Sequence, residues 1–338
     1  MTKILWRILG AVPTLFGVVL ATFLLTRVLP GDPAVFFASN PSMTAADIAE
    51  VRQSLGLDKS LPMQFLIYLN ALGHGDLGQS ISTGQAVTTE LRNRLPASAE
   101  LTIFAFLLAA GIAIPLGVLA ALRPGSIIDH ACRLIATLGV SMPTFVTGLL
   151  LVYVFYYLLG VAPEPIGRLD PFLSNPPEVT RFLLIDSLIA GDFDTFWAAA
   201  RQIILPGVTM ALFALAPLAR MTRASMLGAL SSEFVRTAKA SGLAWRTVVF
   251  SYAFRNAMLP LVTTLGMTFS YMLGANVLVE RVFAWPGIGA FALDSLIALD
   301  YAPLQGFMLT MAGIFLLVNL ITDLTVAVID PRAGLNNG

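Results

Sequence analysis

Six apolar segments, separated by polar stretches, constrain this chain more than any other feature. They cover residues 8–29, 101–122, 133–160, 203–218, 261–279 and 306–329. A helix needs about 20 apolar residues to cross a bilayer. Hydrophobic residues make up 57% of the 338 residues and charged residues only 12%, which is unlike the balance of soluble domains. We therefore predict an all-α integral membrane protein with six transmembrane helices.

Basic residues indicate how these helices are oriented. Lys3 and Arg7 precede the first apolar segment, and residues 219–260, between the fourth and fifth segments, form the most basic stretch of the chain. Short basic connectors between spans lie in the cytoplasm. The pattern therefore places both termini and residues 219–260 in the cytoplasm, and residues 31–96 and 161–202 outside.

Local signals predict interruptions and short helices. Ser141-Met142-Pro143 should break the third span, because proline removes a helical hydrogen bond. The break is either a packing kink or a site that lines a pathway. Prolines predict irregular structure in residues 161–202, with a surface helix at 181–190. Within residues 31–96, apolar periodicity predicts helices at 47–55 and 63–72.

The basic segment itself contains a predicted short helix, residues 233–239. Ser231 or Ser232 is the expected N-cap, and Gly242 is the expected stop. We expect this helix to project into the cytoplasm without a packing face of its own. Such a helix needs a partner on which to dock.

Several motifs resemble those of one transporter family. The segment at 236–242 reads Arg-Thr-Ala, three residues, Gly, where the general loop of ABC importers begins Glu-Ala-Ala. The other matching segments are Leu-Pro-Gly-Asp-Pro (29–33), Leu-Gly-Leu-Asp (55–58), Gly-Asp-Leu-Gly (75–78), Arg-Asn-Ala-Met-Leu-Pro (255–260) and Phe-Ala-Trp-Pro-Gly-Ile-Gly (283–289). Together they resemble the first-type membrane subunit of ABC importers of the dipeptide/oligopeptide/nickel family.

The resemblance implies an architecture and partners. Residues 1–30 would hold the N-terminus and first span, 31–96 a small external domain, and 97–330 the type-1 transmembrane domain, which includes the external loop 161–202 and the cytoplasmic coupling loop 219–260. The implied complex lies in the bacterial inner membrane and contains a second homologous permease, two ATPase subunits and an external binding protein. ATP and Mg²⁺ would bind to the ATPases, and this chain would carry no cofactor.

The same resemblance implies that the chain imports dipeptides or short oligopeptides, with nickel and glutathione left open. The residues expected to contact the ATPase are Glu233, Arg236, Thr237, Ala238, Lys239, Ala240, Ser241 and Gly242. We expect bulky residues at Ala238 or Gly242 to abolish transport without affecting membrane insertion.

Polar residues within apolar segments are candidates for the translocation pathway. The candidates are Ser141, Pro143, Asn276, Glu280, Asn319 and Asp323. For Asn276 and Asn319, hydrogen bonding between helices is the favoured role. Asp323 is interpreted as a structural contact, with a gate or proton site as the alternative. Gly266, Gly274 and Ala275 suggest close approach of neighbouring helices.

Chemical motifs are missing from the sequence. It contains no Gly-Lys-Ser/Thr phosphate loop, no metal-ligand cluster and no hydrolase motif. We therefore expect neither an enzyme nor a metal protein, and no nucleic-acid partner. The alternatives to an importer subunit are a proton-coupled secondary carrier that uses Asp323 and a non-transporting membrane scaffold.

Overall fold

The computed structural model describes residues 2–28, 53 and 58–330. This part of the chain forms helices and turns, with an isolated bridge between Gln79 and Ala86 and no longer strand. The helix expected at 47–55 and the motif at 29–33 lie outside the described residues. The chain divides into two compact units, residues 1–97 with 286–316 and residues 98–285 with 317–338.

In its described residues, the first unit contains two complete short helices, the N-terminal helix and parts of two longer ones. Their bounds are α1 Thr2–Val28, α4 Leu61–Gly73, α13 Ile288–Ile297, the beginning of α5 Val87–Leu122 and the beginning of α14 Tyr301–Ile329. Helix α4 confirms the helix predicted at 63–72.

Aromatic side chains pack α4 against α1. The ring of Phe23 lies 5.1 Å from that of Phe65 and stacks 5.8 Å from that of Tyr68. Arg27 donates to Gln64 over 2.8 Å. Long apolar helices bury such rings against each other because aromatic pairs combine large contact areas with favourable edge and offset geometries.

A second packing group in this unit surrounds the start of α5. Val87 and Ile288 are buried together, and a Cβ atom at Gly306 would lie only 2.5 Å from Val87. The buried carboxylate of Asp300 accepts a 2.7 Å hydrogen bond from Ser80. Glycine at position 306 therefore permits α14 to approach α5 closely here.

The second unit contains the remaining helices. Their bounds are α6 Ile127–Ser141, α7 Thr144–Leu151, the π-helix η1 Val152–Leu158, α8 Leu183–Ala190, α9 Phe193–Leu230, α10 Glu233–Ala240, α11 Trp245–Thr247, the π-helix η2 Val248–Phe254 and α12 Arg255–Val282, with the ends of α5 and α14.

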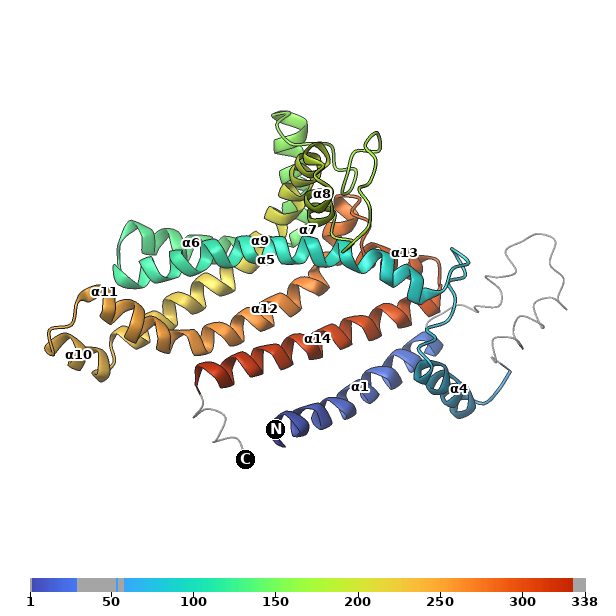
Figure 1. Ribbon diagram of the computed structural model, residues 1–338, viewed down its shortest axis with the longest axis horizontal. Helices are drawn as coiled ribbons and strands as arrows, with labels where there is room; N and C mark the ends of the chain where they lie inside the picture. The colour runs from blue at the N-terminus through green and yellow to red at the C-terminus, as the bar shows by residue number, and fades with distance from the viewer. Residues whose placement is uncertain (1, 29–52, 54–57, 331–338) are drawn as a thin grey trace. The chain divides into compact units, whose positions relative to one another are not determined.

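Helix α9 is the centre of this unit, and α12, α6, α7 and α8 pack along it (Figure 1). Small residues allow the closest contacts. A Cβ at Gly117 of α5 would lie 2.6 Å from Cβ of Thr222, and one at Gly139 of α6 would lie 2.8 Å from the Leu212 carbonyl oxygen. Glycine at such positions is typical of packed membrane helices.

The small residues predicted to mark close approach behave differently from one another. A Cβ at Gly266 would collide with Thr322 of α14, so α12 and α14 do approach closely there. Gly274 has no neighbour within 4 Å of such an atom. Of these two described glycines, Gly266 therefore lies at a close helix contact as predicted, and Gly274 does not.

The third apolar segment is broken where the sequence predicts. Helix α6 ends at Ser141, Met142 has extended backbone with φ −121° and ψ 138°, and α7 begins after Pro143. The residue before a proline avoids the helical region because of steric clash with the proline ring. The segment is therefore two helices followed by η1, rather than one continuous span.

The fourth apolar segment is longer than predicted. Residues 203–218 form the middle of α9, which has 38 residues and contains Pro206 and Pro217. Because helices of the same unit pack along α9, the prolines do not end it. Most of the segment at 219–260 is consequently helical, as the end of α9, α10, α11, η2 and the start of α12.

Among the described residues, four helices are long and apolar enough to cross a membrane. They are Val87–Leu122, Phe193–Leu230, Trp245–Gly274 and Tyr301–Ile329. Shorter apolar helices are present in α1, at Pro13–Leu25, and in the segment of α7 and η1, at Thr144–Leu158. The all-helical architecture is thus confirmed for the described residues, and the six spans and their orientation remain predictions.

Two carboxylates organise the irregular segment before α9. Asp186 of α8 is buried and accepts hydrogen bonds from the backbone of Thr180 and Arg181, where Arg181 has φ 67°. Burial opposes ionisation of Asp186, but these hydrogen bonds lower its pKa. Glu100 of α5 pairs with Arg168 at 2.6 Å. The predicted irregular loop and its surface helix are both present, and they are tied down by these contacts.

Candidate functional site

The short helix predicted at 233–239 is present as α10, and its ends match the sequence signals. Ser232 is the N-cap by position, with extended backbone but no side-chain capping bond. At the other end, Gly242 has φ 76°, its N–H bonds to the Lys239 carbonyl, and the Leu243 N–H bonds to the Ala238 carbonyl. This pair of bonds is the Schellman arrangement, which uses glycine because the left-handed backbone clashes with a Cβ. Gly242 therefore terminates α10, as the sequence predicts.

Helix α10 has two distinct faces, which corrects the expectation that it lacks a packing face. Val235 is fully buried and Ala238 is 5% exposed, both in a cluster that includes Val118 of α5, Met226 of α9 and Val248 of η2. Residues three apart lie on one side of a helix. The charged residues of the segment hid this apolar pair in the sequence.

The other face of α10 is polar and exposed. Its exposed residues are Glu233, Phe234, Arg236, Thr237, Lys239 and Ala240. Arg236 pairs with Glu233 at 2.7 Å, and the Lys239 ammonium lies 4.7 Å from the centre of the Trp245 ring. Exposed ion pairs contribute only about 0–1 kcal/mol, so these groups are available to another protein.

The residues predicted for coupling therefore divide between the two faces. Ala238 belongs to the chain's own core, whereas the other seven, including Ser241 and Gly242 just after the helix, are exposed. A Cβ at Gly242 would meet no atom within 4 Å, so the constraint at this position is backbone conformation and not space.

Two of the pathway candidates belong to a buried polar group between α5 and α12. Glu280 is fully buried and accepts a 2.5 Å hydrogen bond from Ser98. The Asn276 amide donates to the Ser98 carbonyl at 3.3 Å and to the Thr102 hydroxyl at 3.2 Å. The predicted interhelical bonding of Asn276 is confirmed. Sequence reasoning missed Ser98 and Thr102, since single hydroxyl residues give no sequence signal.

The other four candidates lie elsewhere in the second unit. Ser141 and Pro143 are exposed at the break after α6, where the Ser141 hydroxyl donates to the Thr137 carbonyl at 2.7 Å. Asn319 is partly buried and Asp323 is exposed, one turn apart on α14. The six candidates thus occupy three places, and the structure does not gather them into one site.

An ion pair that sequence reasoning missed joins α6 to α9. Asp129 is 1% exposed and pairs with Arg223 through both of its carboxylate oxygens. The Gly125 N–H also donates to Asp129 at 2.9 Å, and Arg133 lies 3.5 Å away. The hydrogen bonds from Arg223 and then from Gly125 hold the pKa of Asp129 well below its usual range.

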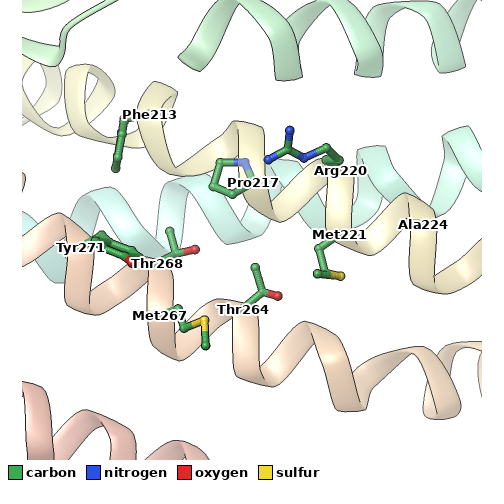
Figure 2. Close-up of a pocket in the computed structure, with 9 residues that line it drawn as sticks. All are labelled: Phe213, Pro217, Arg220, Met221, Ala224, Thr264, Met267, Thr268 and Tyr271. Carbon is green, nitrogen blue, oxygen red and sulfur yellow. The ribbon is translucent and has the colours of Figure 1, made fainter. Parts of the chain in front are cut away.

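Arg220 lines two cavities that border α9. The first, of about 340 Å³, lies between α9 and α12. Figure 2 shows Phe213 and Met221 of α9 across from Thr264 and Tyr271 of α12. The second cavity, of about 580 Å³, lies between α6 and α9 and is also lined by Arg133, Arg223 and Ser141. Volumes of this size are typical of small-molecule sites.

Comparison with known proteins places these features in a family. Residues 113–334 match the model of the "binding-protein-dependent transport system inner membrane component", and residues 1–102 match that of its N-terminal region. Together these matches extend over nearly the whole chain.

Individual relatives are similar over their full lengths. The probable D,D-dipeptide transport system permease protein DdpB of Escherichia coli K12 is 42% identical, over 98% of this chain and 99% of the relative. The di/tripeptide permease protein DppB of Pseudomonas aeruginosa is 40% identical over 95% of both chains, and the dipeptide permease protein DppB of E. coli K12 is 38% identical over 98% of both. The chain therefore belongs to the family of inner membrane components of binding-protein-dependent transport systems, and it is a transport subunit of that membrane.

Proposed function

We propose that this chain is a permease subunit of an ATP-driven importer and forms half of the pathway for dipeptides or short oligopeptides. The observation that carries the proposal is the near full-length similarity to three permeases named for peptide transport. The long apolar helices and the exposed polar face of α10 are what such a subunit needs. Nickel and glutathione are the competing substrates within the predicted family.

The proposed topology has six spans with both termini in the cytoplasm. The first span would lie in residues 1–30, followed by an external domain in 31–96 and the transmembrane domain in 97–330. Within this domain, residues 161–202 would face outward and 219–260 inward. The supporting observations are the basic character of 219–260 and the apolar helices that flank α10.

The proposed complex contains this chain, a second homologous permease, two ATP-binding cassette subunits and an external binding protein. ATP and Mg²⁺ would bind on the ATPases. Six spans are few to enclose a pathway alone, so a heterodimer is expected. The exposed face of α10, with Glu233, Arg236, Thr237, Lys239 and Ala240, would contact one ATPase, together with Ser241 and Gly242.

In this mechanism, closure of the ATPase pair would move α10 and switch the pathway between inward-facing and outward-facing states by rigid-body rearrangement. Ser141, Pro143, Asn276, Glu280, Asn319 and Asp323 remain the proposed pathway positions. The buried group around Glu280 would hold α5 to α12 during this movement, because breaking a buried hydrogen bond is costly.

Purification from native membranes in mild detergent tests the proposal. Mass spectrometry should find a second permease and two ATPases with this chain, and peptide-loaded binding protein should stimulate ATP hydrolysis. Crosslinking from position 239 before solubilisation should capture an ATPase. Recovery of the chain without ATPases, and no crosslink from position 239, would refute the proposed coupling. If nickel or glutathione stimulated ATP hydrolysis and peptides did not, the proposed peptide substrate would be wrong and the stimulating compound would take its place.

A further inference from the structure

The lining of the cavity between α9 and α12 indicates how a substrate is held. Its lining combines a cation, Arg220, with aromatic rings, two methionines and hydroxyl groups. Figure 2 shows the Arg220 side chain running back along α9 toward Pro217, above the side chains of α12. Because helical side chains point toward the helix N-terminus, this direction is the ordinary one for arginine.

Among the described residues, Arg220 has no acidic partner, unlike the neighbouring Arg223 and Arg133. Arg223 is bound to Asp129, and Arg133 lies 3.5 Å from the same carboxylate. Within the described part of the chain, Arg220 forms neither an ion pair nor a side-chain hydrogen bond, and it is exposed. Its guanidinium group therefore offers all its donors to an anion that enters either cavity.

The remaining lining suits an organic anion better than an inorganic one. Phe213 and Tyr271 supply apolar ring surface, and Met221 and Met267 supply flexible thioether side chains. Methionine-rich surfaces adapt to side chains of different shapes. The Thr264 hydroxyl donates to the Pro260 carbonyl at 2.8 Å, which leaves its oxygen free to accept from an N–H group.

We propose that Arg220 binds the terminal carboxylate of the transported peptide, whose backbone and side chains occupy the cavity between Phe213 and Tyr271. This inference rests on the proposed peptide transport and deepens it. A free peptide carboxylate is ionised at neutral pH, and arginine binds carboxylates in a planar two-point geometry. The exposed Tyr271 ring can also accept the peptide ammonium group on its face.

The test uses the whole transporter with its binding protein in phosphatidylcholine vesicles that contain ATP. Arg220→Gln should lower uptake of a labelled dipeptide about tenfold, the effect expected when one charge-assisted contact is lost. Arg220→Lys should fall between Gln and the native protein. The matched control is Arg123→Gln, which removes an exposed arginine outside both cavities and should not change uptake.

A binding measurement separates contact with the peptide from an effect on packing. Met267 is 56% exposed in this cavity, whereas the native Cys132 is buried. In a Met267→Cys variant, an excess of dipeptide should protect the new thiol from a maleimide, and the same dipeptide with an amidated C-terminus should not. Adding Arg220→Gln should remove the protection while ATPase stimulation by the loaded binding protein persists.

Three results would overturn the proposal. Native-level uptake in Arg220→Gln would show that the residue does not hold the substrate. Equal protection by the amidated peptide would show that the carboxylate is not recognised. An Arg220→Gln defect that is present in vesicles containing phosphatidylglycerol and absent in pure phosphatidylcholine would assign Arg220 to a lipid phosphate. By contrast, failure of the native protein to take up any dipeptide would refute the proposed function and this assignment with it.

Discussion

The two faces of α10 can be separated experimentally, because one is held by the chain and the other is free for a partner. Val235 has no exposed surface and lies in the cluster that attaches α10 to α5, α9 and η2. Phe234, the adjacent residue, is 41% exposed. Val235→Ala should loosen the attachment of α10, and Phe234→Ala should leave it intact.

The size of the first effect follows from the buried carbons. Val235→Ala removes two buried methyl groups, which costs about 1.6 kcal/mol at roughly 0.8 kcal/mol for each. This free energy corresponds to a roughly fifteenfold larger population of conformations with α10 detached. Since α10 has only Val235 and Ala238 as buried residues, little else compensates for the loss.

Hydrogen exchange measures this population. In the purified chain in detergent, the amides of α10 should exchange about fifteenfold faster in Val235→Ala than in the native protein, while the amides of α9 keep their rates. Phe234→Ala should exchange like the native chain and should instead weaken ATPase stimulation in the complex. Equal exchange in native and Val235→Ala protein would refute the packing argument, as would equal acceleration by both substitutions.

Three further predictions concern packing, charge and energy source. Gly139→Leu should lower the midpoint of thermal unfolding in detergent because it collides with the Leu212 carbonyl, whereas Gly228→Leu, at a position with no neighbour within 4 Å, should not. The lowered pKa of Asp129 means that its ionised carboxylate stabilises the fold above the unfolded-state pKa of about 3.9, and that this stabilisation is lost as pH falls below that value. Asp129→Asn should therefore unfold more easily than the native protein at pH 7, and it should lose less stability than the native protein between pH 5 and 3. Uptake by ATP-loaded vesicles should persist in the presence of a protonophore; uptake that collapses with the proton gradient but continues without ATP would favour the carrier that uses Asp323.

Local signals were sufficient for the features that depend on a few adjacent residues. Gly242 ends α10 because its left-handed backbone favours glycine, and Pro143 separates α6 from α7 because the residue before it becomes extended. Both follow from steric rules that act within one turn of chain. The length of α9 was missed for the opposite reason, since packing against neighbouring helices overrode the local effect of its two prolines.

Contacts between distant residues could not be predicted in this way. Arg223 and Asp129 are 94 positions apart, and Ser98 and Glu280 are 182 apart. The sequence identifies Asp129 and Glu280 as acidic residues near or within apolar segments. It does not show which residues of other helices pair with them. The buried pair Val235 and Ala238 was similarly hidden because most of its neighbours in the sequence are polar.

The packing of α10 also changes the mechanical interpretation of the proposed coupling loop, residues 219–260. A projecting helix without a packing face could swing on its connections and transmit little to the membrane. Val235 and Ala238 instead join α10 to a cluster that includes Met226 of α9 and Ala257 of α12. Close-packed interiors transmit displacements rather than absorb them. A partner that pushes on the exposed face of α10 therefore acts directly on α9 and α12, the two helices that line the cavity of Arg220.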